Sequence, residues 1–271
     1  MKIFKYSCKK FTSMSDLPFS DQDYSKYKHG SKRVSRLFGT ELGNSFLRDK
    51  GLELANLENK NIVVCSAPYN YIPVASTILK DYFFSSFNSI WAEYYESPQD
   101  LKIFRGHNYV ADYSTMSYED RIKAINSDEF YIDKEFIKEK TLFLIDDIRI
   151  TGSHEQTMIK LLERINFEGI VYFIYYAELI GNQVSASIEN DLNYAFVKNI
   201  NNINYIIQND EFIFNTRVTK FILSQKEEDF KNFIDYQSKS FRHTLKTNSM
   251  GNSYHKKEEF INNFNYLISK I

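Results

Sequence analysis

The sequence has few of the features that stabilise a small secreted protein or anchor a chain in a bilayer. Only two cysteines occur among 271 residues, Cys8 and Cys65, and they lie far apart without a CxxC pair. This argues against a disulfide framework. No apolar run approaches the length of a transmembrane helix, and the first residues lack the apolar stretch of a signal peptide. We therefore expect a cytoplasmic protein that does not bind a membrane.

An excess of charge of either sign is also missing. Lysine and arginine number 34 against 35 aspartates and glutamates, so no positive field is available to attract nucleic acid or anionic lipid. We expect no nucleic-acid partner. In contrast, 43% of the residues are apolar and 16% are aromatic, which is enough for a substantial core in a chain of this length.

The apolar runs alternate with amphipathic segments, a rhythm that predicts an α/β fold with a mostly parallel, doubly wound sheet. Residues 1–31 look irregular, and residues 32–51 are expected to form one or two short helices. After residue 226 the pattern indicates two amphipathic helices, 227–246 and 256–270, with a flexible joint at 247–253. The expected strands lie near 61–66, 101–105, 141–147, 169–178 and 194–199, and further helices near 73–88, 117–126, 133–139, 154–166 and 201–210.

The most informative segment is the strand that starts at Thr141. It ends in two adjacent acids, Asp146 and Asp147, at the strand end where open α/β sheets bind ligands. A turn, Thr151-Gly152-Ser153-His154, then leads into a helix, and its backbone N–H groups and hydroxyls can surround a phosphate. Two acids for a diol beside a cradle for an anion suit a ribose 5-phosphate.

This pattern resembles the phosphoribosyl-pyrophosphate (PRPP) motif of type I phosphoribosyltransferases, and the resemblance extends over about residues 60–200. It implies that Asp146 and Asp147 hold the ribose hydroxyls. It implies further that a phosphate loop holds the 5-phosphate, formed by Ile150, Thr151, Gly152, Ser153 and His154. The sequence departs from the family pattern at Arg149, usually an apolar or small residue, and at His154, usually a hydroxyl residue. The whole chain also resembles a divergent bacterial branch associated with tellurium-resistance gene clusters.

A second strand-turn-helix lies upstream and implies the pyrophosphate loop of the same family, formed by Ser66, Ala67, Pro68 and Tyr69. This loop lacks the basic residue and the glycine of many relatives. The long polar segment that follows is typical of a lid, and the family's mobile loop lies there. Lys102, Arg105 and His107 are its candidate pyrophosphate partners, although solvated surface charges explain each of them equally well.

The resemblance also predicts how the chain is divided. Residues 1–60 form an N-terminal segment that can contribute to a variable hood over the acceptor base, 61–225 a phosphoribosyltransferase-like core, and 226–271 a C-terminal helical extension. Phe212, Phe214 and Arg217 are further hood candidates. A small basic cluster at 27–33 can bind an anion, or can simply be the solvated start of a helix.

The implied activity is that of a pentosyltransferase that moves ribose 5-phosphate from PRPP to a nitrogenous base and releases pyrophosphate. Mg²⁺ is the implied cofactor and is expected to bind through PRPP rather than directly to protein side chains. The implied partners are PRPP and the base, and a homodimer is a candidate assembly. Two alternatives stay open: a non-catalytic PRPP or nucleotide-binding regulator on the same fold, and an α/β interaction protein in which the acids are solvated residues of a turn.

Overall fold

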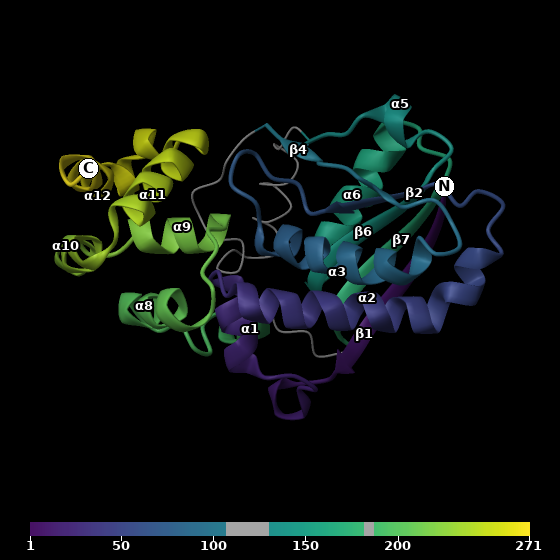
Figure 1. Cartoon of the computed structure of the whole chain (residues 1–271), viewed down its shortest axis with the longest axis horizontal. Helices are drawn as coiled ribbons and strands as arrows, with labels where there is room; N and C mark the ends of the chain where they lie inside the picture. Colours follow the sequence, from purple (N-terminus) through teal and green to yellow (C-terminus); the bar gives the residue numbers. More distant parts are fainter. Residues whose placement is uncertain (107–129, 182–186) are drawn as a thin grey trace.

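The computed structural model describes residues 1–106, 130–181 and 187–271, and this part of the chain forms a parallel sheet with helices on both faces (Figure 1). Five strands pair in the order β1-β7-β6-β2-β3, and every neighbouring pair is parallel. The α/β fold predicted from the sequence is confirmed. The strands are β1 (Lys2–Phe11), β2 (Ile62–Ser66), β3 (Gln99–Asp100), β6 (Thr141–Arg149) and β7 (Ile170–Leu179).

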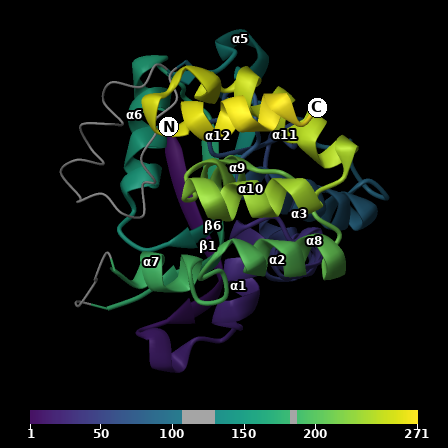
Figure 2. The same cartoon turned by 90° about the vertical axis from the view of Figure 1, so that its left-hand side faces the viewer.

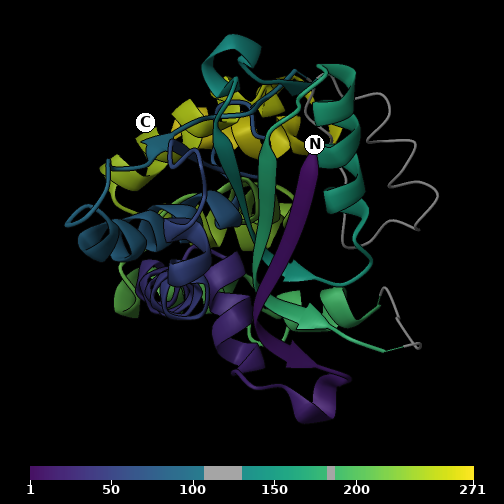
Figure 3. The same cartoon turned by 90° about the vertical axis from the view of Figure 1, so that its right-hand side faces the viewer.

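Two layers of helices cover the sheet, as the edge-on view in Figure 3 shows. The helices α2 (Lys32–Ala55) and α3 (Ala75–Trp91) lie on one face, and α6 (Ser153–Arg164) lies on the other. Successive strand residues point to opposite faces. Phe143 and Tyr172 therefore pack in the cluster with α2 and α3, whereas Leu142 and Val171 pack in the cluster with α6. Both faces of the central strands are buried, which explains their continuous apolar runs.

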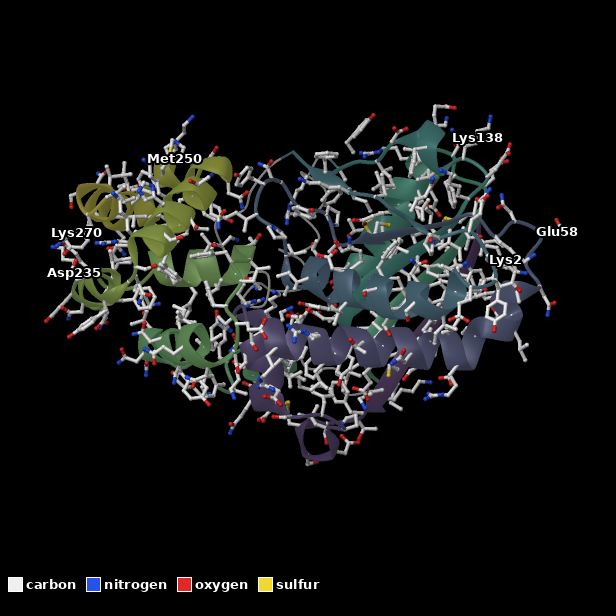
Figure 4. All side chains as sticks on the ribbon, in the orientation of Figure 1. Lys2, Glu58, Lys138, Asp235, Met250 and Lys270 are labelled. Atoms are coloured by element: carbon white, nitrogen blue, oxygen red, sulfur yellow. The ribbon has the colours of Figure 1, made fainter. Side chains whose placement is uncertain are left out.

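A third apolar cluster holds the C-terminal helices together. They lie at the end of the molecule far from the N-terminus (Figure 1), and Figure 2 views them from that end. Its centre includes Ile203, Val218, Phe230 and Leu267. Figure 4 shows Asp235 and Lys270 at the outer surface of this unit, where their side chains form an ion pair of 3.0 Å. The helices are α8 (Ile200–Asn209), α9 (Thr216–Leu223), α10 (Glu227–Tyr236), α11 (Lys239–Gly251) and α12 (Glu258–Ser269).

Shorter elements connect these layers. Strands β4 (Phe104–Arg105) and β5 (Phe130–Tyr131) form a small antiparallel pair. Among the described helices, none combines the length and the apolar character needed to cross a bilayer. The remaining elements are the 3₁₀ turns η1 (Met14–Asp16) and η3 (Tyr254–Lys256) and the helices α1 (Asp21–Lys28), α5 (Lys134–Ile137) and α7 (Ser187–Asn193).

The prediction that residues 1–31 are irregular is wrong. They form β1, which pairs with β7 along the edge of the sheet, and α1. The lysines of β1 hide the strand pattern, because an edge strand can keep charged side chains in solvent. Residues 32–51 belong to one long helix rather than two short ones. Gly39 in α2 permits a close approach to α3, since a Cβ atom there would lie 2.5 Å from the carbonyl oxygen of Leu79.

Three other expectations need correction. Of the strand predicted at 101–105, only residues 104–105 form a strand, β4, which pairs with β5, whereas the strand that joins the sheet beside β2 is β3 and ends at Asp100. Residues 194–199 connect α7 to α8, and the backbone N–H of Val197 bonds to the Ser25 hydroxyl instead of a strand. The C-terminal segment forms three helices, with α11 running through the expected joint and Ser238 capping its start. The helix expected at 117–126 lies outside the described residues.

Candidate functional site

A cavity of about 470 Å³ lies at the carboxyl ends of β2 and β6. The chain leaves these neighbouring strands in opposite directions, since β2 leads through α3 to β3 while β6 leads through α6 to β7. Such a switch point is where open α/β sheets bind ligands. Residues of α9 and α12 complete the wall from the C-terminal helices, so the cavity lies between the sheet and that helical unit.

Most of the predicted site residues meet in this cavity. Those in its wall are Asp146, Asp147, Ile150, Thr151, Gly152, Ser153, His154, Ser66, Ala67, Pro68 and Arg105. Lys102 and Tyr69 lie outside the wall. The Lys102 ammonium donates to the carbonyl of Asn70 and lies 4.2 Å from the ring centroid of Tyr69. His107 lies outside the described residues.

The two acids have different surroundings because adjacent strand residues point to opposite faces. Asp146 lies on the α6 side, where its Oδ2 is 3.4 Å from Nδ1 of His154. Asp147 lies on the α1 side and is buried. Its Oδ2 accepts from the Lys28 ammonium at 2.5 Å and from the Tyr27 hydroxyl at 3.2 Å. The chain thus presents one accessible acid and one acid already paired with a cation.

These surroundings determine the charges. Burial acts to raise the pKa of Asp147, but the Lys28 ammonium and the N–H of Ile148 outweigh it, with Arg217 contributing, so that this pKa lies below its ordinary value. Desolvation acts to lower the pKa of His154, but the hydrogen bond and attraction to Asp146 raise it above its ordinary value. Asp147 is therefore an anion at neutral pH, and His154 keeps its positive charge to a higher pH than an ordinary histidine does.

The turn after β6 is built to leave N–H groups at the cavity. Gly152 is the N-cap of α6 and has a φ of +72°, in the left-handed region where glycine carries no steric cost. The first N–H groups of a helix have no partner within the helix. The hydroxyls of Thr151 and Ser153 lie 3.0 Å apart in the same turn. Together these N–H groups and hydroxyls can donate hydrogen bonds to a bound phosphate.

A network of ion pairs and hydrogen bonds holds the turn after β6 in place. The buried carboxylate of Glu155 lies 2.6 Å from the Lys5 ammonium and 3.0 Å from Nε of Arg149, and accepts from the Tyr175 hydroxyl at 3.0 Å. Arg149 also bonds to Glu178 at 2.9 Å. This explains the departure at Arg149: its guanidinium lies 3.1 Å from where a Cβ on Gly152 would stand, so it packs against the turn and joins it to β1 and β7.

The loop between β2 and α3 is held by other segments. The Ser66 hydroxyl lies 2.9 Å from that of Thr77 at the start of α3. Tyr69 accepts a backbone hydrogen bond of 3.2 Å from Arg105, which places the arginine beside the loop. On the other side, the Thr216 hydroxyl donates to the carbonyl of Ile72 at 2.9 Å. The loop therefore touches both the β4 segment and α9.

For other residues of the cavity wall, the sequence offers weaker indications of a binding role or none at all. Lys28 belongs to the basic cluster at 27–33, and Arg217 was a hood candidate, but the pairing of Lys28 with Asp147 had no local signal. Phe212 and Phe214, the other hood candidates, pack against Phe241 in the C-terminal cluster. Further residues of the wall have no site signal in the sequence: Glu155, Tyr175, Glu189, Tyr194, Thr216, Lys220, Phe221, Glu259 and Phe260.

The carboxylates of the cavity wall are also candidate ligands for a metal ion. Within residues 1–106, 130–181 and 187–271, no group of three or more histidine, cysteine, aspartate or glutamate side chains is arranged to hold an ion. Asp146 and Asp147 offer carboxylate oxygens, the ligands that Mg²⁺ prefers. Two carboxylates suit an ion that keeps most of its shell as water and substrate oxygens.

The comparisons with known proteins extend over nearly the whole chain. A family model described as "PRTase ComF-like" matches residues 4–267. No curated protein matches the chain. The matched range includes β1 and the C-terminal helices as well as the segment that carries the two acids.

Proposed function

Because the chain belongs to the ComF-like phosphoribosyltransferase family, we propose that it transfers ribose 5-phosphate from PRPP to a nitrogenous base and releases pyrophosphate. One observation carries the proposal. The adjacent acids Asp146 and Asp147 and the phosphate turn 150–154 line the same cavity at the switch point of the sheet. A sugar diol and its phosphate can therefore be bound together.

Each part of the wall has a role in this proposal. Asp146 and Asp147 accept hydrogen bonds from the ribose hydroxyls, and the turn 150–154 binds the 5-phosphate with N–H groups, hydroxyls and the His154 ring. Ser66, Ala67, Pro68 and Arg105 face the diphosphate. Tyr69 stays in the proposal only as support for this loop, since it lies outside the cavity wall.

The reaction breaks the bond between ribose C1 and a pyrophosphate oxygen and forms a bond from C1 to a ring nitrogen of the base. Positive charge develops on the ribose, near the two carboxylates. The chain contributes orientation, charge balance and exclusion of water, which would otherwise capture the same centre. Asp146 and Asp147 offer the carboxylates that would hold PRPP-bound Mg²⁺, and the ion would supply positive charge for the leaving pyrophosphate.

The test has two steps. Isothermal titration with PRPP and Mg²⁺ should show binding, and a pyrophosphate-release assay over purine and pyrimidine bases should then show turnover with at least one of them. If PRPP at millimolar concentration does not bind, the assignment fails and an α/β interaction protein is favoured.

A second function is favoured by two specific observations. Asp147 is already paired with the Lys28 ammonium at 2.5 Å, and the loop after β2 carries no basic residue. Both features suit a non-catalytic regulator that binds PRPP or a nucleotide on the same fold. PRPP binding without pyrophosphate release for any base would support this regulator. We also propose a cytoplasmic setting; the bacterial tellurium-resistance context rests on sequence resemblance alone.

A further inference from the structure

At the diphosphate end of the cavity, the loop after β2 has no cation of its own, and Arg105 of β4 is the cation that the proposed function assigns to this end. Residues 66–70 after β2 read Ser-Ala-Pro-Tyr-Asn and contain no lysine or arginine. A diphosphate carries several negative charges, and its strongest protein partners are cations, above all the planar guanidinium of arginine. If this loop binds pyrophosphate, positive charge has to come from another element.

The helix α9 is fastened directly to that loop. The backbone N–H of Thr216 donates to the carbonyl of Pro73 at 2.8 Å, and the Thr216 hydroxyl donates to the carbonyl of Ile72 at 2.9 Å. Thr216 is the first residue of α9 and lies in the cavity wall. The start of this helix therefore has a fixed position relative to the loop.

A second anchor joins α9 to α1. The side chain of Asn215 is fully buried; its Oδ1 accepts from the N–H of Val218 at 3.0 Å and caps the helix. Its Nδ2 donates to the carbonyl of Lys28 at 3.1 Å. The side-chain amide of Asn215 thus holds both Lys28, which pairs with Asp147, and the start of α9.

These anchors orient two cations. Arg217 directly follows Thr216, and Lys220 lies three residues further along the same helix face; both line the cavity. The positive charge of Arg217 also helps to lower the pKa of Asp147, which indicates that the guanidinium is near the ribose acids. Arg217 therefore shares one cavity wall with the two acids and with Ser66–Pro68 of the loop.

We propose that Arg217, with Lys220 one turn further along α9, binds the diphosphate of PRPP and supplies the positive charge that the loop after β2 lacks. Asn215 and Thr216 are positioning residues that hold α9 for this contact. The inference rests on the proposed function, because it assigns the leaving-group end of the same substrate site.

The experiment compares three ligands by isothermal titration in the presence of Mg²⁺: PRPP, inorganic pyrophosphate and ribose 5-phosphate. Arg217→Gln should weaken the binding of PRPP and of pyrophosphate by about tenfold or more, since a hydrogen bond to a charged group is lost. The affinity for ribose 5-phosphate should not change. Lys220→Gln should give a smaller loss with the same pattern, and Arg217→Lys should restore part of the affinity.

Controls separate the contact from folding. Arg48→Gln changes an exposed arginine of α2 outside the cavity wall and should leave all three affinities as in the wild type. Thr216→Val removes the hydroxyl bond to Ile72 and should weaken pyrophosphate binding several-fold while ribose 5-phosphate binding persists.

Unchanged PRPP affinity in Arg217→Gln would overturn the inference, and so would an equal loss for ribose 5-phosphate. A wild-type protein that binds ribose 5-phosphate and PRPP with equal affinity, and does not bind pyrophosphate, would overturn it while leaving the ribose site intact. A wild-type protein that binds none of the three ligands would instead contradict the proposed function itself.

Discussion

The two turns at the carboxyl edge of the sheet are built differently. The turn after β6 carries its binding groups within residues 146–154, and a buried network from β1, β6, α6 and β7 holds it in place. The loop after β2 has no charged residue of its own, and it is held by β4 and α9. One half of the site is contained in a short segment, whereas the other is assembled from distant parts.

Because of this difference, the two halves of the candidate site should respond to substitutions at different places in the chain. Substitutions near residues 149–155 should act on the ribose 5-phosphate half, because supports and binding groups are neighbours there. The diphosphate half should instead respond to substitutions in α9, far along the chain.

Removing both acids should have the largest effect. Asp146→Asn combined with Asp147→Asn should abolish PRPP binding measured by titration, because neither ribose hydroxyl would find a carboxylate. Circular dichroism should still report the wild-type helix content. Asp235→Asn, an exposed acid at the outer end of the helical unit, is the matched control and should bind PRPP normally. Unchanged affinity in the double variant would contradict the assignment of the ribose site.

The buried network should matter for stability. Glu155→Gln removes the charge that Lys5 and Arg149 share, and we expect the free energy of unfolding in urea to fall by about 2 kcal/mol. Ribose 5-phosphate affinity should fall with it, because the turn loses its support. Glu227→Gln removes an exposed partner of Lys231 and should leave the free energy of unfolding nearly unchanged. Equal effects of the two substitutions would show that the network does not stabilise the turn.

The backbone of the turn gives a third test. Gly152→Ala places a Cβ at a φ of +72° and close to the Arg149 guanidinium, so the free energy of unfolding should fall by about 1 kcal/mol. Gly51→Ala is the control, because its Cβ would meet only Leu47 at 3.5 Å within α2. That variant should be stabilised by about 0.5–1 kcal/mol. A neutral Gly152→Ala variant would mean that the turn relaxes freely.

The smallest effect concerns pH. The folded-state pKa of His154 is raised, so its positive charge is fully present below the ordinary value of 6.5 and is lost as the pH rises through the raised value. Ribose 5-phosphate affinity should therefore decline a few-fold over that interval relative to His154→Gln. The comparison with this variant removes the titration of the phosphate itself. Parallel pH profiles for the two proteins would exclude a contact from the His154 charge.

The same contrast explains what the sequence could predict. The two acids and the turn that follows form one continuous segment with an apolar run before it and a helix after it, so the fold and the place of these residues in the cavity wall could be predicted. Ser66, Ala67 and Pro68 were predicted in the same way, from a second strand end, and they also line the cavity. Their meeting in one cavity follows from the adjacency of β2 and β6 in a parallel sheet.

What could not be predicted depends on contacts between remote residues. Lys28 pairs with Asp147 across 119 positions, and Thr216 reaches Ile72 across 144. No local pattern encodes either contact, because the side chains involved are equally suited to a solvated helix. Lys102 is a candidate whose sequence position was misleading. It is close to the loop after β2, but its ammonium donates to the carbonyl of Asn70 and packs over the ring of Tyr69, and it does not line the cavity.

The edge strand β1 has a consequence for how the protein is made. Its pairing with β7 runs from Lys2 opposite Ile170 to Phe11 opposite Leu179, and Lys5 contributes to the ion network beneath the phosphate turn. During synthesis, β1 leaves the ribosome long before β7 and must therefore wait for that strand before the two can pair. Contacts this distant slow folding and leave strand edges exposed to other chains. We expect the nascent chain to depend on chaperones until residue 179 has emerged.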